Sequence, residues 1–424
     1  MSNIYLCVLL AGLCVLANCH HVPGHQGGHD GHEHPQEDQP PTESHQENGL
    51  LSYRKIAPSA LDFTLKFYHQ VHPKADGKNI FFSPVSIVSA FLLVALGAKG
   101  NTLDQILSGL CYNQSMTSMQ EIDDGVHHLL QWLNRPEAKL ELSTGSALFT
   151  ADKFQLQQEI LNKARDLFHA DVVPANFKNP EEAVTQINSY IERKTHGKLV
   201  DVVKGLDPEM AMVLVNYVFM KGYWEKPFNH ELTRKKAFSI NNETTVQVDM
   251  MYRDGYYLTY HDDELDCDVV QIPYQGNASA LFILPQKGKL HQVEQALGRE
   301  VFLKWEASQK LRRIELSLPK VSLYTSHDVK EALIGLGVTE VFTDQADLSA
   351  FTGHPDLKIS KAYHKAYLNI HENGTEAAAA TVIEIVPTSL PPAVIFDRPY
   401  LLMVADHVAR VPLFFARIMN PIEH

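Results

Sequence analysis

The chain has few cysteines, and three of its five (Cys7, Cys14 and Cys19) lie within the first 19 residues. Only Cys111 and Cys267 remain for the rest of the chain. This excludes a framework of several disulfides, and 424 residues are enough to bury a stable core without one. We expect these two cysteines to be free thiols, with a single bridge between them as the alternative.

The chain also lacks an excess of basic residues and, beyond its first 19 residues, any apolar run of 18 residues. A formal net charge of −13 argues against nonspecific binding of nucleic acid. Without a long apolar run we expect no membrane-spanning helix. The motifs Gly-x-Ser-x-Gly and His-Glu-x-x-His and a glycine-rich phosphate loop are missing, so we expect neither an enzyme nor a bound cofactor or metal.

The N-terminal region has two parts of different composition. Residues 4–17 are apolar and are followed by small residues, so residues 1–19 are predicted to be a secretory signal, although the usual basic start is missing. Residues 20–51 are polar and acidic and are predicted to form a disordered tail. The histidines of this tail are zinc or copper ligands by type, but no spacing fixes a geometry, so we interpret the tail as a solvated spacer. They are His20, His21, His25, His29, His32, His34 and His45.

From residue 52 onward, helix and strand patterns follow one another without the regular spacing of a parallel α/β protein, which predicts a single α+β domain over residues 52–424. Residues 120–133 place apolar side chains on one helical face. Residues 212–220 are nearly all apolar, as in a central strand buried on both faces, and Asn216 within them must find hydrogen-bond partners. Residues 400–404 and 412–419 are predicted to form a final hairpin.

Residues 371–392 combine conflicting local signals. Four alanines favour helix, the β-branched residues after them favour strand, and three prolines lacking a backbone donor close the segment. In a strand, one face would carry only small side chains, those of Thr375, Ala377, Ala379 and Thr381. This favours a loop that can later become a strand beneath packed side chains. The alternative is a surface loop with one helical turn.

Four motifs resemble the serpin family, and most closely its plasma alpha-1-antitrypsin-like group. Residues 372–381 (Glu-Asn-Gly-Thr-Glu-Ala-Ala-Ala-Ala-Thr) resemble the serpin hinge, and residues 396–400 (Phe-Asp-Arg-Pro-Tyr) resemble the strand entry after its reactive loop. Residues 79–87 and 221–228 resemble two further family motifs, and the likeness spans about residues 53–422. It implies three β-sheets, eight to nine helices and an exposed reactive loop at about 372–396. The implied hinge comprises Gly374, Thr375, Glu376, Ala377, Ala378, Ala379, Ala380 and Thr381.

The resemblance implies a suicide-type inhibitor. A serine protease attacks the loop, forms an acyl-enzyme and is trapped when the cut loop inserts as a strand. In this group the attacked residue lies fourteen positions after the hinge glycine, which gives the bond Thr388-Ser389. No arginine, lysine or aromatic residue lies between Gly374 and Phe396, so we expect an extracellular, elastase-like protease as the partner.

The resemblance also implies a shutter, where strands part to admit the loop, formed by Ser83, Ser86, Asn216 and His364. In heparin-activated relatives the helix that corresponds to residues 120–133 is basic. Here it has no lysine or arginine, so we expect no heparin activation through it, and we expect a monomer.

Four sequons predict glycosylation, at Asn113, Asn242, Asn277 and Asn373, of which we expect the hinge sequon at Asn373 to be unoccupied. The alternative function is a carrier of a hormone or other small ligand on the same fold. The intact hinge favours the inhibitor, and Arg410 stands where the cortisol carrier has a ligand-stacking tryptophan.

Overall fold

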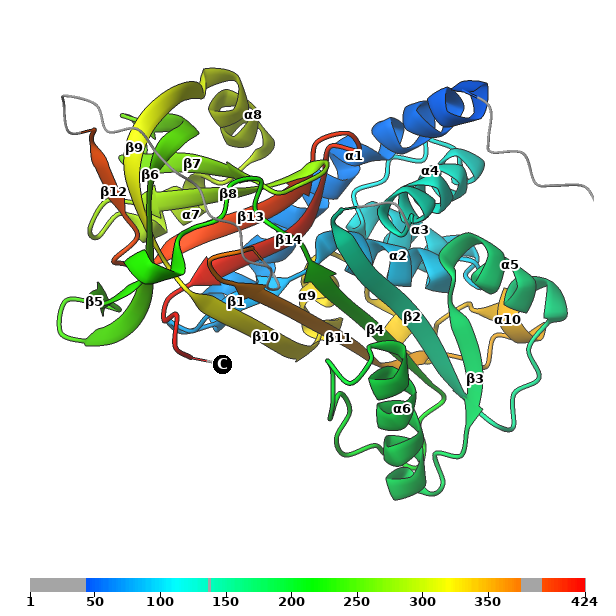
Figure 1. Cartoon of the computed structure of the whole chain (residues 1–424). Helices are drawn as coiled ribbons and strands as arrows, with labels where there is room; N and C mark the ends of the chain where they lie inside the picture. Colours follow the sequence, from blue (N-terminus) through cyan, green and yellow to red (C-terminus); the bar gives the residue numbers. More distant parts are fainter. Residues whose placement is uncertain (1–42, 136–138, 375–390, 424) are drawn as a thin grey trace, which may run out of the picture. The chain divides into compact units, whose positions relative to one another are not determined.

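The computed structural model describes residues 43–135, 139–374 and 391–423 of the chain (Figure 1). The predicted signal (1–19), most of the predicted tail (20–42) and the greater part of the predicted reactive loop (375–390) lie outside these residues. The described residues all belong to one folded unit, which spans residues 43–424.

Two hydrogen-bonded sheets organise the described residues. The five-stranded sheet, here the central sheet, has the order β10 (Val321–Asp328), β11 (Ile359–Ile370), β4 (Met212–Lys221), β2 (Glu141–Ala151), β3 (Asp171–Ala175). The nine-stranded sheet has the order β1 (Ile80–Phe82), β14 (Val411–Ile418), β13 (Tyr400–Asp406), β8 (Ala278–Pro285), β7 (Cys267–Pro273), β6 (Thr245–Asp262), β9 (Lys310–Pro319), β12 (Ala393–Ile395), with β5 (Arg234–Ser239) beside β6.

Ten α-helices and three short 3-10 helices accompany the sheets in the described part of the chain. The α-helices are α1 (Glu43–Val71), α2 (Pro84–Ala95), α3 (Gly100–Gly109), α4 (Met119–Leu133), α5 (Gln158–Phe168), α6 (Pro180–Lys194), α7 (Leu290–Ala296), α8 (Arg299–Ser308), α9 (Lys330–Gly335) and α10 (Ser349–Thr352). The 3-10 helices are η1 (His72–Lys74), η2 (His230–Leu232) and η3 (Glu340–Phe342).

The central sheet is covered on both faces, which explains the apolar sequence of β4. On one face lies α2, all of whose residues are buried, as expected of a helix that is apolar all round. On the other face, Val213 and Val215 of β4 share a second core cluster with Ile187 and Ile191 of α6. The apolar side chains of β4 from Met212 to Val215 therefore enter the two cores alternately.

Several predictions are confirmed. The chain is α+β, β4 and the hairpin β13–β14 form where expected, and Cys111 and Cys267 are free. The predicted helix at residues 120–133 is α4, which begins with a capping box between Ser118 and Glu121. None of the helices that the structure describes is long and apolar enough to span a membrane.

Three details differ from expectation. Two hydrogen-bonded sheets replace the expected three, because β6 is 18 residues long and pairs with β5, β7 and β9, which joins two sheets into one. The described residues form ten α-helices rather than eight or nine. Helix α1 begins at Glu43 rather than near residue 52, since residues 43–51 contain several good helix formers and no proline.

Candidate functional site

The strands β11 and β4 are parallel neighbours at the centre of the central sheet, and their contact line is called the seam here (brown and dark green in Figure 1). Eight residue pairs form its register, from Ile359 and Met212 to Tyr367 and Phe219. Both strands run in the same direction and finish at the same end of the sheet. The segment that follows β11 therefore leaves the sheet at the end of the seam.

The chain reverses direction immediately after β11. His371 and Gly374 exchange both backbone hydrogen bonds, at 2.9 and 3.0 Å, and Gly374 forms an antiparallel bridge with Tyr223, just beyond β4. Gly374 has φ +123°, and a Cβ there would lie 2.2 Å from the carbonyl oxygen of Gly222. Only glycine fits this position. The turn therefore places Gly374 beside Tyr223, at the end of the seam.

A tryptophan anchors this reversal. Trp224 is fully buried, its Nε1 donates to the carbonyl of His371 at 2.9 Å, and its backbone N–H donates to the carbonyl of Asn373 at 2.9 Å. Its indole stacks on Tyr274 with ring centroids 4.2 Å apart. The turn is therefore held by hydrogen bonds in a dry environment.

The carboxylate of Glu372 is buried within the same turn. Lys320 Nζ lies 3.0 Å from its Oε2, and the Thr233 hydroxyl donates to Oε1 at 2.8 Å. His230 Nδ1 lies 3.4 Å from Oε2. Burial alone would raise the pKa of Glu372, but a backbone hydrogen bond and the side chains of Lys320 and Thr233 outweigh it and hold that pKa below its usual value.

Asn216 of β4 makes every hydrogen bond that its side chain allows. Its Oδ1 accepts from Ser86 Oγ at 2.7 Å and from His364 Nδ1 at 2.7 Å. Its Nδ2 donates to the carbonyl of Gly145 at 3.1 Å and to Ser146 Oγ at 3.0 Å. This confirms that the polar residue in the apolar strand has partners, and it links β2, β4, β11 and α2.

The hydrogen bond between Asn216 and His364 crosses the seam. The two residues face each other in the register of β4 and β11. The backbone N–H of Ser83 donates to His364 Nε2 at 3.0 Å, so Nε2 carries no proton and the neutral ring donates through Nδ1. Parting the strands would break this bond between side chains together with the ladder.

Lys365 lies beside His364 in β11 and points to the opposite face, toward α6. Its Nζ donates to the carbonyl of Val200 and lies 4.6 Å from the ring centroid of Tyr324. Burial lowers the pKa of Lys365 to about 8, and Asp201 opposes this shift only partly. An ammonium group that is 1% exposed therefore adjoins the seam on this face.

The structure brings together the four residues of the predicted shutter, Ser83, Ser86, Asn216 and His364, around the seam. Of the predicted hinge it describes Gly374, and the rest lies outside the described residues, as do both residues of the predicted reactive bond: Thr375, Glu376, Ala377, Ala378, Ala379, Ala380, Thr381, Thr388 and Ser389. Among the sequon asparagines, Asn113 and Asn242 are exposed, Asn277 is half-buried and Asn373 is 4% exposed.

Sequence reasoning missed the partners of Glu372 and the buried Lys365. Lys320 and Thr233 lie 52 and 139 positions from Glu372, so no local spacing connects them. Lys365 had one usable signal, because it stands inside a strand of mostly apolar and aromatic residues. Within residues 43–135, 139–374 and 391–423, no group of three or more His, Cys, Asp or Glu residues is placed to hold a metal ion.

Comparison with known proteins agrees with this geometry. The family model described as Serpin (serine protease inhibitor) matches residues 58–421. Alpha-1-antitrypsin of Sus scrofa is 41% identical over 420 residues, which cover 99% of each chain. The crystal structure of human thyroxine-binding globulin complexed with thyroxine has a TM-score of 0.84 at 36% identity, covering 88% of this chain and 100% of that one. Human kallistatin has a TM-score of 0.82 at 35% identity, covering 88% and 100%. With its central sheet, its seam and the turn at residues 371–374, the chain belongs to the serpin family, a family of serine protease inhibitors rather than of enzymes.

Proposed function

We propose that this chain is a secreted, suicide-type inhibitor of an extracellular serine protease of the elastase type. The protease attacks the bond Thr388-Ser389, and the cut loop enters the seam as a new strand. The observation that carries this proposal is the turn at residues 371–374, in which Gly374 pairs antiparallel with Tyr223 at the end of the seam. Since β11 and β4 are parallel, a strand that turns back from β11 would lie antiparallel to both.

The energetics of the seam support insertion as a spontaneous step. Opening the seam breaks one ladder of eight residue pairs, and an inserted strand builds two, so the net gain is one ladder. At about 0.5–1.5 kcal/mol per hydrogen bond this is roughly 4–12 kcal/mol, comparable with the whole stability of an ordinary domain. The uncut form must then be maintained by a kinetic barrier. Opening the seam must also break the bond between Asn216 and His364 that crosses it.

The proposed target rests on the loop sequence and on the relatives. Thr388 is small and β-branched, which suits the shallow specificity pocket of elastase-like proteases better than the acidic pocket of trypsin. The relatives named alpha-1-antitrypsin and alpha-1-antiproteinase are 41–42% identical over nearly the whole chain. We extend the proposal to secretion through residues 1–19 and to glycans on Asn113, Asn242 and Asn277. We propose that Asn373 carries none, because its buried position leaves no room for a glycan.

A second candidate is a small-ligand carrier. It is favoured by the similarity to thyroxine-binding globulin in complex with thyroxine. The hinge sequence favours the inhibitor, because the face formed by Thr375, Ala377, Ala379 and Thr381 carries only small, uncharged side chains that can pass beneath packed side chains.

The test is incubation of the intact chain with pancreatic elastase. We expect a covalent complex that survives boiling in detergent, and a cut form that melts at a much higher temperature than the intact form. Thr375→Arg should abolish the complex and leave only cleaved chain, because a buried unpaired charge costs several kcal/mol. The matched control is Glu376→Arg, whose side chain lies on the other face of the same strand and should leave complex formation unchanged.

Complete cleavage at Thr388 without complex formation would make the wild-type chain a substrate and would defeat the proposal. Equal melting temperatures of the cut and intact forms would do the same. Fluorescence titration with thyroxine on the same sample tests the carrier function independently.

A further inference from the structure

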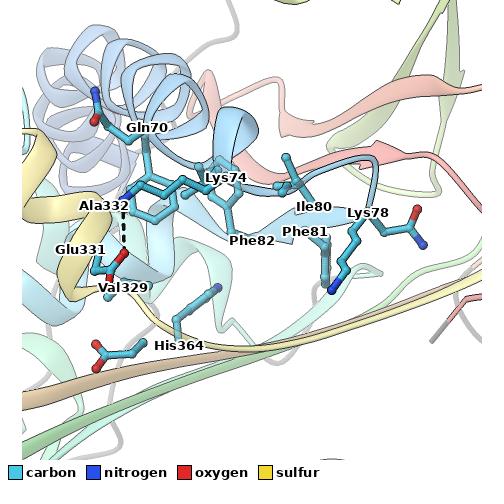
Figure 2. Close-up of a pocket in the computed structure, with 15 residues that line it drawn as sticks. Gln70, Lys74, Lys78, Ile80, Phe81, Phe82, Val329, Glu331, Ala332 and His364 are labelled. Atoms are coloured by element: carbon cyan, nitrogen blue, oxygen red, sulfur yellow. Dashed lines mark hydrogen bonds and ion pairs between the residues drawn. The ribbon is translucent and has the colours of Figure 1, made fainter.

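A cavity of about 310 Å³ lies outside the hinge turn, where the end of α1, η1, β1, the end of β10 and the start of α9 meet. Figure 2 shows Ile80, Phe81 and Phe82 of β1 on one side and Val329, Glu331 and Ala332 on the other. The proposed inhibitory function assigns no role to this cavity. Its size falls within the range of small-molecule sites, roughly 300–1,000 Å³.

Part of the cavity wall is apolar. Phe67, Phe81 and Phe82 are 2–3% exposed, and the rings of Phe67 and Phe82 pack with centroids 4.8 Å apart. Val329 and Ala332 close the opposite wall and are buried as well. Water in such a space has few polar partners, so an apolar group that displaces it gains free energy.

Two lysines, Lys74 and Lys78, and two carboxylates, Asp328 and Glu331, line the cavity, so what matters is which of them are paired. Lys74 Nζ is paired with Glu331 Oε2 at 3.2 Å, and Asp328 Oδ1 accepts from the backbone N–H of Lys330 at 3.0 Å. Lys78 is exposed, lines the cavity and has no ion-pair partner among the residues that the structure describes. The rim therefore offers an ammonium group to an anion.

His364 connects the cavity to the seam. Its ring forms part of the cavity wall, while both of its nitrogens are engaged, with Ser83 and with Asn216. A molecule in the cavity would touch the ring carbons and restrict the ring. Any contact made there acts on the residue whose bond to Asn216 crosses the seam.

We propose that this cavity is a binding site for a small amphipathic anion, a carboxylate with an apolar chain of about ten carbons. The chain lies among Phe67, Phe81 and Phe82, and the carboxylate pairs with Lys78 at the rim. Occupancy stabilises the folded, uncut chain because the ligand binds that state and not the unfolded one. The site does not depend on the proposed inhibitory function.

The test uses decanoate and decylammonium, which share a chain and differ in the sign of the head group. Calorimetric titration of the intact chain should give one saturable decanoate site. Decylammonium should bind at least about fivefold more weakly than decanoate does. Decanoate should raise the melting temperature in proportion to its occupancy of the site. Its affinity should fall with added salt, because the ion pair at the rim is exposed.

Two variants and one control locate the site. Lys78→Glu should weaken decanoate about fivefold and strengthen decylammonium. Lys178→Glu, the same change at an exposed lysine remote from the cavity lining, should change neither. Ala75→Trp, at a half-buried position of the lining, should abolish binding of both probes by filling the space. Lys78→Glu is a surface change that leaves folding intact, so the charge test stands even if the tryptophan variant misfolds.

Three results would each overturn the proposal. They are the absence of saturable decanoate binding, equal affinity for the two probes, and decanoate binding that both cavity variants leave unchanged.

Discussion

Glu372 and Lys320 form an ion pair whose partners differ greatly in exposure, and this difference predicts unequal costs for removing each. The side chain of Glu372 is 2% exposed and that of Lys320 is 39% exposed. We therefore compare Lys320→Met, which leaves a carboxylate buried, with Glu372→Gln, which leaves an ammonium group that can reach water.

The magnitudes depend on the contacts that each partner keeps. Without Lys320, the carboxylate keeps its hydrogen bond from the hydroxyl of Thr233 but loses its ion pair with an ammonium group. An uncompensated buried charge of this kind costs about 3–5 kcal/mol. In Glu372→Gln the amide oxygen still accepts from Thr233, so only a charge-assisted bond is lost, at about 1–2 kcal/mol. The double variant should lie close to Glu372→Gln alone.

The assay is urea unfolding of the intact chain, followed by tryptophan fluorescence, to which Trp224 of the same turn contributes together with Trp132 and Trp305. At pH 7 we expect Lys320→Met to lose about 2 kcal/mol more stability than Glu372→Gln does. Lys235→Met is the control. Lys235 pairs with Asp249 on the surface, where both side chains are about half exposed or more, and its loss should cost at most about 1 kcal/mol.

Acid separates the two variants further. In the wild type the pKa of Glu372 is held below its usual value, so its contribution is present above the usual pKa and is lost as pH falls through the lowered one. In Lys320→Met burial dominates and raises that pKa, so protonation should relieve the variant and shrink its deficit below pH 5. If Glu372→Gln costs as much as Lys320→Met, or if the deficit of Lys320→Met persists in acid, the reasoning from exposure is wrong.

Two further predictions concern single residues near the seam. Lys365→Met should raise the urea midpoint, since it removes a charge whose burial is costly. Wild-type stability should rise from about pH 8 toward pH 10.5, because over that range the Lys365 ammonium keeps its proton only in the unfolded chain. If Lys365→Met lacks this rise, the rise is due to Lys365. Gly374→Ala should lower the melting temperature by several degrees, because its Cβ would lie 2.2 Å from the Gly222 oxygen in a left-handed backbone. An unchanged melting temperature would contradict this prediction and show that the turn accommodates a Cβ at Gly374 at little cost.

The sequence predicted those features that depend on local periodicity. The unbroken apolar run of β4 indicated a strand covered on both faces, and α2 and α6 provide the two covers. The polar Asn216 inside that run indicated a buried network, but not that Ser146 and Gly145 of a neighbouring strand complete it. Those partners depend on strand order, which single-strand patterns do not contain.

The ion pair of Glu372 could not be predicted from local sequence patterns either, because its partners are distant in the sequence. Its partners come from segments that approach the turn only when the sheets pack together. The joining of two expected sheets through β6 could not be predicted from the sequence either. A strand of 18 residues can change partners along its length, and nothing in its sequence states where it does so.

Three buried polar groups lie at the seam, and they bear on how it would open under the proposed mechanism. Asn216 faces His364 across it, and Lys365 adjoins it from the other side of the sheet. A seam of apolar side chains would be more stable, because charged and polar groups lose hydration on burial. Parting strands with apolar side chains, however, exposes apolar surface to water, which costs free energy. Asn, His and Lys side chains instead form hydrogen bonds to water when the strands separate, and this offsets part of the cost. The polar seam therefore lowers the stability of the closed sheet and the cost of opening it at once, which is the combination that an inserting loop requires.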